Sequence, residues 1–169
     1  MKKNLILLGM MAVGKTTLGR IVAKKLKLKF IDTDVCIEKK NSMPIVDIFE
    51  KKGEIFFREE EEKEVLKSLK QKNCIIAIGG GAFINKNIRE NILKNAISIW
   101  LKVDPSVLDK RVKRNFKRPL LKVKNNRAKL RELYEKRKSV YELANHKINC
   151  DGFTKENIVK KITSIYEKY

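Results

Sequence analysis

Near its start the chain reads Gly9-Met10-Met11-Ala12-Val13-Gly14-Lys15-Thr16, a full match to the pattern G-x-x-x-x-G-K-[ST]. A largely apolar run at 4–8 precedes it and predicts a buried strand, and residues 15–27 predict a helix. In this strand–loop–helix setting, backbone N–H groups of the loop surround phosphate oxygens, helped by the positive end of the helix. Lys15 is expected to reach the β- and γ-phosphates, and the Thr16 hydroxyl to hold Mg²⁺. The sequence therefore predicts binding of ATP or GTP together with Mg²⁺.

Apolar runs alternate with helical patterns along the rest of the chain. Further strands are expected at residues 29–31, 74–78, 96–101 and 147–149. Helices are expected at 34–51 with an interruption at Pro44, and at 54–70, 87–94, 126–144 and 154–168, with another opening at Asp104-Pro105. Strands that are apolar throughout and separated by helices are typical of a parallel sheet covered on both faces. We expect one α/β domain over residues 1–169.

The charge of the chain is its most unusual bulk property. Its 169 residues include 40 Lys and Arg against 20 Asp and Glu, a formal net charge of +20. Such a balance is typical of nucleic-acid-binding proteins, but 31 of the basic residues are lysines, which an AT-rich genome supplies in excess. With 7% aromatic residues and no RNA-binding motif, the sequence gives little support to the alternative of a nucleic-acid-binding protein, and we expect no nucleic-acid partner.

Several other classes are excluded by composition. No stretch approaches the roughly 18 to 20 apolar residues of a membrane-spanning helix, and the apolar run after Lys3 is too short for a signal peptide. The cysteines, Cys36, Cys74 and Cys150, lack metal-site spacing and are expected to be buried free thiols in a reducing compartment. We therefore expect a cytoplasmic protein with no membrane partner, and a monomer by default.

The class of nucleotide enzyme can be narrowed further. A GTPase usually carries the base-reading motif Asn-Lys-x-Asp, and Asn85-Lys86-Asn87-Ile88 fails at its fourth position. A motor or helicase needs a far longer chain. A small phosphotransferase remains, and three further clusters of residues bear on what it phosphorylates.

The first cluster is Phe30-Ile31-Asp32-Thr33-Asp34, where the second expected strand ends. Two carboxylates at i and i+2 of a strand point the same way, here toward the edge of the sheet where ligands bind. One could help to hold Mg²⁺ while the other receives a hydroxyl proton. The alternative is that Asp32 or Asp34 is a helix N-cap.

The other two clusters are Gly53-Glu54-Ile55-Phe56-Phe57-Arg58 and the triple glycine Gly79-Gly80-Gly81. Glutamates follow Arg58, so the alternative to a binding role is a solvated salt-bridge face made by Glu59–Glu62 and Glu64. The glycines follow a buried strand, where the lack of side chains lets backbone amides approach a ligand closely.

Taken together, these segments resemble the shikimate kinase family over nearly the whole chain and in the family's order. The segments that carry the resemblance, after the phosphate loop, are Thr17-x-Gly19-Arg20, Phe30-x-Asp32-x-Asp34, Gly53-Glu54-x-x-Phe57-Arg58, Gly79–Gly81, Arg118-Pro119-Leu120-Leu121 and Arg137-x-x-x-Tyr141. The resemblance implies a P-loop kinase fold, with a three-layer α/β/α arrangement, a five-stranded parallel sheet of order 2-3-1-4-5, a substrate segment at about 32–60 and a mobile lid at about 112–124.

The resemblance also implies a reaction, the Mg²⁺- and ATP-dependent phosphorylation of the 3-hydroxyl of shikimate on the route to chorismate and the aromatic amino acids. Its alternative is another P-loop kinase of a small carboxylate or sugar acid such as gluconate. Arg58 and Arg137 as a pair favour an acceptor that bears a carboxylate, because arginine is suited to bidentate carboxylate recognition.

Residue roles follow from the same resemblance. Shikimate is assigned to Asp34, Arg58, Gly79, Gly80, Gly81 and Arg137. The nucleotide is assigned to Ala12, Val13, Gly14, Lys15, Thr16, Thr17, Arg111, Arg118 and Thr154, with Arg114 as a competitor of Arg111. Mg²⁺ is assigned to Thr16 and Asp32, and catalysis to Asp34, Lys15 and Arg118. Whether Asp34 takes the hydroxyl proton or only orients the hydroxyl is left open. Trp100 and His146 are expected to be structural.

Overall fold

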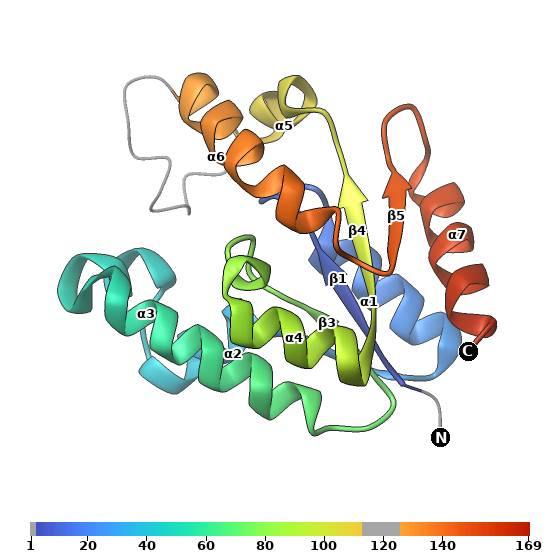
Figure 1. Cartoon of the computed structure of the whole chain (residues 1–169), viewed down its shortest axis with the longest axis horizontal. Helices are drawn as coiled ribbons and strands as arrows, with labels where there is room; N and C mark the ends of the chain where they lie inside the picture. The colour runs from blue at the N-terminus through green and yellow to red at the C-terminus, as the bar shows by residue number, and fades with distance from the viewer. Residues whose placement is uncertain (1–2, 113–125) are drawn as a thin grey trace.

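The centre of the molecule is a parallel sheet. The computed structural model describes residues 3–112 and 126–169, and over these residues the strand order is β2-β3-β1-β4-β5, as predicted (Figure 1). The strands are β1 (Asn4–Leu8), β2 (Lys29–Asp32), β3 (Cys74–Ala77), β4 (Ala96–Lys102) and β5 (His146–Asn149). In the central register Leu7 lies opposite Ala77 on one side and Ile99 on the other. The predicted strands are confirmed, with ends that differ by a residue or so.

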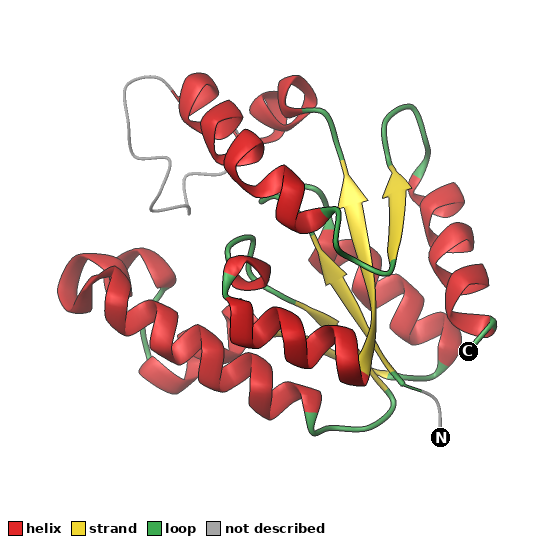
Figure 2. Cartoon of the chain, in the orientation of Figure 1, coloured by secondary structure: helices red, strands yellow, loops and turns green. Residues whose placement is uncertain are grey.

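Helices cover both faces of this sheet, which gives the three layers expected (Figure 2). On one face α1 (Lys15–Leu26) packs against α7 (Lys155–Glu167). The other helices in the described ranges are α2 (Thr33–Asn41), α3 (Ile45–Leu69), α4 (Lys86–Asn95), α5 (Pro105–Val112), α6 (Asn126–Tyr141) and the short 3₁₀ helix η1 (Ala82–Ile84). Of these, α4 lies on β4, α3 contacts both α2 and α4, and α5 contacts α6. Because the strands are parallel, the loops at their carboxyl ends meet at one edge.

Two hydrophobic clusters support this arrangement. The larger fills both faces of the sheet and includes all of β1 apart from Asn4, together with Trp100, which is 1% exposed. The structural assignment of Trp100 is therefore confirmed. A smaller cluster lies between α2 and α3 and is made of Ile37, Ile45, Ile48 and Phe57. The predicted substrate segment thus has a small core of its own.

Helix α3 changes direction at Gly53. There φ is 84° and ψ is 167°, a combination open essentially to glycine alone, so the 25-residue element consists of two helical stretches. The sequence predicted a break between residues 51 and 54 and another at Pro44. Both are confirmed, since α2 ends at Asn41 and Pro44 immediately precedes α3.

The three cysteines differ in burial, and the single histidine contacts a tyrosine near the C-terminus. Cys74 and Cys150 are buried free thiols as expected, whereas Cys36, which lies on α2 near Glu64, is only half-buried. His146 Nε2 lies 2.9 Å from the Tyr169 hydroxyl. Within residues 3–112 and 126–169 the helices are all too short or too polar to span a membrane.

Candidate active site

The phosphate loop connects β1 to α1 and forms one wall of a pocket. Gly14 is the N-cap of α1, with φ at 102°, so the first N–H groups of the helix face the loop. Lys15 Nζ donates hydrogen bonds to the Gly9 and Met10 carbonyl oxygens, at 2.8 and 2.9 Å, which holds the ammonium across the loop. This phosphate-loop pocket is lined by Ala12, Gly14, Lys15, Thr16, Thr17, Asp32, Asp34, Val35, Glu38, Ile45, Ala77 and Ile78. Val13 belongs to the hydrophobic core.

Asp32 connects the phosphate loop to α2. Its Oδ2 accepts a hydrogen bond from the Thr16 hydroxyl at 2.6 Å, and its Oδ1 accepts from the backbone N–H groups of Asp34 and Val35. The N-cap interpretation of Asp32 is therefore correct, and it leaves the second oxygen directed at Thr16. A hydroxyl and a carboxylate oxygen side by side are ligands of the type that Mg²⁺ prefers.

Asp34 lies at the start of a helix, as the helix expected from residue 34 predicted, and the strand alternation expected for the Asp32–Asp34 pair is wrong. Strand β2 ends at Asp32, so Asp34 lies in the first turn of α2 and the alternation of side chains along a strand does not apply. Both carboxylates nevertheless line the phosphate-loop pocket, because the N-cap at Asp32 begins the helix that carries Asp34.

A second pocket lies on the other side of Asp34 and is referred to below as the arginine pocket. It is lined by Met11, Asp34, Ile45, Phe49, Phe57, Arg58, Glu61, Gly79, Gly80, Gly81 and Arg137. All the residues that the sequence assigned to the acceptor line the arginine pocket. Asp34 and Ile45 line both pockets.

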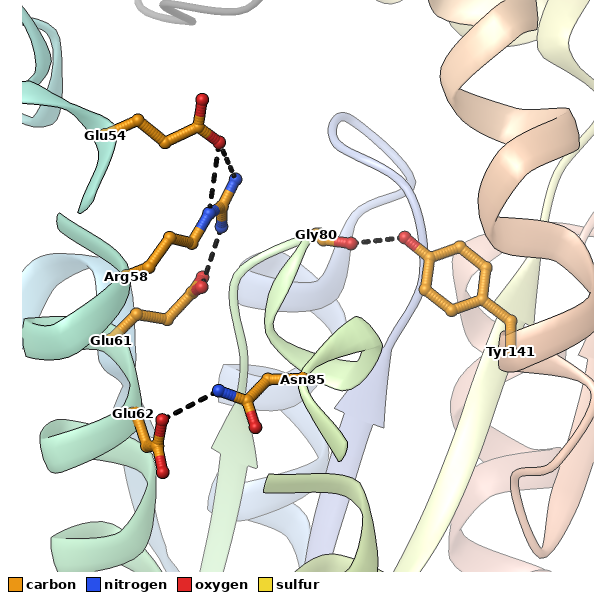
Figure 3. Close-up of polar contacts among 7 residues, drawn as sticks. All are labelled: Glu54, Arg58, Glu61, Glu62, Gly80, Asn85 and Tyr141. Carbon is orange, nitrogen blue, oxygen red and sulfur yellow. Dashed lines mark hydrogen bonds and ion pairs between the residues drawn. The ribbon is translucent and has the colours of Figure 1, made fainter. Parts of the chain in front are cut away.

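Arg58 is held by two carboxylates (Figure 3). Its Nη1 donates to Glu61 Oε2 at 2.7 Å, and its Nε and Nη2 donate to Glu54 Oε1. The Glu61 side chain is 2% exposed, against 32% for Arg58. Burial raises the pKa of Glu61 above its ordinary value in spite of Arg58, and the nearby charge of Asp34 acts in the same direction. Burial would lower the pKa of Arg58, but the charge of Glu61 and the hydrogen bond to it raise that pKa above its usual range.

The solvated face of Glu59–Glu62 and Glu64, the alternative given for this segment, is wrong for most of these glutamates. Only Glu59 is exposed, and Glu60, Glu61 and Glu64 are buried. Glu62 accepts a hydrogen bond from Asn85 at 2.7 Å (Figure 3) and another from Asn87 at 2.6 Å. The physical reason is that α3 is covered by α2 on one side and by α4 on another. Glu61 is therefore a site residue that sequence reasoning missed, and its i,i+3 spacing from Arg58 is the signal that could have found it.

The triple glycine provides room for these side chains. A Cβ atom on Gly79 would collide with Glu61 Oε1 and lie 2.8 Å from Asp34 Oδ1, and one on Gly81 would lie 2.6 Å from Arg58 Nη1. The missing side chains therefore admit the charged side chains of other elements, as well as any ligand.

Arg137 completes the arginine pocket from α6. It is 7% exposed, and its Nη1 would lie 3.4 Å from a Cβ on Gly80. The two arginines therefore reach the glycine loop from different helices, as a carboxylate fork requires. Of the predicted nucleotide residues outside the loop, Arg111 on α5 donates from Nη1 to the Ala12 carbonyl at 3.4 Å, and Thr154 is the N-cap of α7.

Three predictions fall on undescribed parts of the chain. Arg114, Arg118 and the expected lid beyond residue 112 lie outside the described residues. Their assignments rest on the sequence.

Comparisons with known proteins agree with this geometry. The family model described as shikimate kinase matches residues 11–167. A curated shikimate kinase from Sulfurihydrogenibium sp. is 43% identical over 95% of this chain and 95% of its own length. The solved structure of a shikimate kinase from Acinetobacter baumannii in complex with shikimate superposes with a TM-score of 0.94 at 34% identity, covering 99% of this chain and 94% of that one.

The alternative acceptor has weaker support. A solved gluconokinase from Sinorhizobium meliloti is similar with a TM-score of 0.61 but only 13% identity, covering 98% of this chain and 92% of that one. At this identity the likeness concerns the fold alone, so it does not favour gluconate.

Glu61 makes a testable contribution to stability. Its raised pKa means that the folded chain binds the Glu61 proton more tightly than the unfolded chain. The stability that Glu61 contributes is therefore fully present below the ordinary glutamate pKa, and this contribution is lost as pH rises through the pKa of Glu61 in the folded state. Glu61→Gln keeps the shape and an acceptor for Arg58 but cannot ionise. We expect the free energy of unfolding of Glu61→Gln, measured by urea titration, to increase relative to that of the unmodified protein as pH rises from 4 to 8.

The control for this measurement is Glu59→Gln, which makes the same change at an exposed position of the same run. The difference in free energy of unfolding between Glu59→Gln and the unmodified protein should be small and nearly constant with pH. A Glu61→Gln difference that is equally constant would contradict the assigned pKa direction.

Proposed function

This chain belongs to the shikimate kinase family, and from that premise we propose that its two pockets bring MgATP and shikimate together for transfer of the γ-phosphoryl group to the 3-hydroxyl. The enzyme is an ATP-dependent kinase of the shikimate pathway. The observation that carries the proposal is that Asp34 lines both the phosphate-loop pocket and the arginine pocket. A group at this junction can contact the accepting hydroxyl while facing the donor phosphate.

The donor side fits ATP and Mg²⁺. Loop N–H groups, the N-terminus of α1 and the Lys15 ammonium offer positive charge to phosphate oxygens. We assign Mg²⁺ to Thr16 and Asp32, whose oxygens are already 2.6 Å apart. Over the described residues no group of three or more His, Cys, Asp or Glu side chains could hold a metal, which suits an ion carried mainly by phosphates and water. When bound, Mg²⁺ supplies charge neutralisation at the β- and γ-phosphates.

The acceptor side fits a small carboxylic acid with hydroxyl groups. Arg58 and Arg137 offer guanidinium donors to the carboxylate, and the glycine loop offers backbone N–H groups without side chains in the way. Ile45, Phe49 and Phe57 supply an apolar wall for the ring face. Glu61 keeps Arg58 on the pocket side and so acts through that arginine.

The chemistry depends mainly on positioning and charge. We assign Asp34 to the 3-hydroxyl, which donates a hydrogen bond to its carboxylate so that the hydroxyl oxygen faces the γ-phosphorus in line. The proton released on transfer has the same carboxylate as its acceptor. Lys15 and Arg118 are assigned to the charge that builds on the transferring group, and residues 112–124 to a lid that excludes water during the reaction. Arg111 and Thr154 are assigned to the adenosine side.

The remaining assignments concern the setting of the enzyme. We propose a single domain acting as a cytoplasmic monomer, with no nucleic-acid or membrane partner. The support is compositional, since the excess of basic residues is mostly lysine without a nucleic-acid-binding motif.

The central test is turnover. With MgATP and shikimate we expect ADP release that depends on shikimate, and little ATP consumption when shikimate is absent, because an open site should not hydrolyse ATP efficiently. Equal ADP release in both mixtures would sink the assignment. Gluconate in place of shikimate serves as the comparison acceptor and should support no turnover above background.

The role of Arg58 is tested better by Arg58→Lys than by removal of the charge, because Glu61 is buried and needs a cation beside it. Lysine keeps that charge but loses the planar fork. We expect the shikimate KM to rise about tenfold or more, with the ATP KM nearly unchanged. The same change at the exposed Arg20 should affect neither constant. A parallel rise in both constants for Arg58→Lys would refute the carboxylate-fork role.

The two roles of Asp32 can be separated by two substitutions. Asp32→Asn keeps an N-cap oxygen, because Asn caps helices about as well as Asp, but removes the charge. We expect the Mg²⁺ concentration for half-maximal rate to rise about tenfold, with little change in the melting temperature. Asp32→Ala should lower the melting temperature as well, by removing the cap. An unchanged Mg²⁺ requirement in Asp32→Asn would remove Asp32 from the metal site.

A further inference from the structure

Tyr141 is a buried hydroxyl for which the reaction described above has no use. It is the last residue of α6, one turn after Arg137, and is 0% exposed. Its ring packs against Trp100 with centroids 5.7 Å apart, which fixes the position of the hydroxyl. That hydroxyl donates a hydrogen bond to the Gly80 carbonyl, across 61 positions of sequence (Figure 3). Tyr141 does not line the arginine pocket, so its contact with the glycine loop is made from behind.

The same hydroxyl contacts other parts of the site. It lies 3.7 Å from the Met10 sulfur in the phosphate loop. Burial raises the pKa of Tyr141 to about 12, and the charge of Arg137 and a hydrogen bond donated by its guanidinium act in the opposite direction. The hydroxyl therefore stays protonated, and remains a donor, at any pH at which the enzyme works. One side chain thus connects α6, the phosphate loop and the glycine loop.

The direction of the Gly80 carbonyl sets the direction of the next N–H group. In a trans peptide the C=O of one residue and the N–H of the next point in opposite directions. The Gly80 carbonyl points toward Tyr141, so the Gly81 N–H points away from it, toward the side where Arg58 lies (Figure 3). An N–H group and a guanidinium on the same side suit an anion.

This peptide is the central one of a turn in which the Ala82 N–H donates to the Gly79 carbonyl at 3.1 Å, a hydrogen bond that is compatible with either direction of the central peptide. It is flanked by two glycines, and neither carries a side chain that would oppose rotation of the peptide. Rotation by half a turn would direct the carbonyl oxygen into the arginine pocket, where it would repel a carboxylate. The buried hydrogen bond from Tyr141 opposes this rotation, because breaking it would leave a donor and an acceptor without partners.

We propose that Tyr141 is a positioning residue for the acceptor, whose hydroxyl holds the Gly80–Gly81 peptide with its N–H directed at the substrate carboxylate and its carbonyl turned away. The inference rests on the proposed function in one respect, namely that the anion in the arginine pocket is the carboxylate of shikimate. The residue acts through the glycine loop and touches no reacting atom.

The first test is kinetic. Tyr141→Phe removes the hydroxyl and keeps the ring against Trp100. We expect the shikimate KM to rise about tenfold, as when a buried acceptor loses its donor, while the ATP KM stays within about twofold. The matched control is Tyr134→Phe, the same change at a buried tyrosine two turns earlier on α6, which should alter neither constant. A Tyr141→Phe shikimate KM within about twofold of the unmodified value, or an equal rise in both KM values, would overturn the proposal.

The second test needs no turnover. The chain contains eight glycines, so labelling with ¹⁵N-glycine gives a spectrum in which each amide can be followed. Relative to the unmodified protein, Tyr141→Phe should shift the Gly81 amide and speed its hydrogen exchange, and Tyr134→Phe should not. Unchanged Gly81 signals in folded Tyr141→Phe would contradict the proposal, even if shikimate proved to be the wrong substrate.

The third test uses the unmodified protein alone and does not depend on any variant folding. Addition of shikimate should shift the Gly81 amide resonance and leave that of Gly152, in the distant turn after β5, in place. Shikimate-dependent turnover without a Gly81 response would overturn the inference and leave the proposed function standing. The absence of shikimate-dependent turnover would instead contradict the proposed function.

Discussion

Space at Gly79, Gly80 and Gly81, which follow β3 after Ile78, is the constraint on which the site depends. A Cβ atom at Gly79 or Gly81 would occupy the volume now filled by Glu61, Asp34 and Arg58. Those side chains come from two helices, and Arg137 approaches the same loop from a third. The glycine loop is therefore a packing solution as much as a ligand-binding one. It lets the charged side chains of Asp34, Arg58, Glu61 and Arg137 lie close to the glycine backbone, which stays at the carboxyl edge of the sheet.

The arginine pocket contains two acidic side chains although the whole molecule is strongly basic. The more buried of them has its pKa raised mainly by desolvation. Ionised Glu61 therefore costs folding free energy, which is offset only in part by Arg58. The cost is consistent with function, because an arginine without a fixed partner would adopt many rotamers and bind a carboxylate less well. Stability is given up here in exchange for a fixed direction of one guanidinium.

The residues themselves predicted a parallel sheet covered on both faces, because apolar strands alternate with helices and a phosphate loop follows the first strand. The strand order was predicted by the resemblance to the shikimate kinase family. The sequence predicted the residues of the arginine pocket through their order along the chain. It did not predict burial on α3, since the exposure of Glu60, Glu61 and Glu64 is decided by α2 and α4, which pack beside them. For the Asp32–Asp34 pair the strand-alternation argument was wrong and its alternative, an N-cap at Asp32, was correct, because the backbone N–H groups of Asp34 and Val35 donate to Asp32.

The contacts that orient the site have a common physical form. Two groups that face the pockets are held by partners behind them: Arg58 by Glu61, and Asp34 by the helix that Asp32 caps. The Gly80 peptide has the same relation to Tyr141, which lies 61 residues away. Arginine, aspartate and glycine are common residues whose chemistry alone does not choose a substrate. Selectivity for one small acid requires them to be fixed within a fraction of an ångström, and that precision depends on contacts formed only when distant segments pack together.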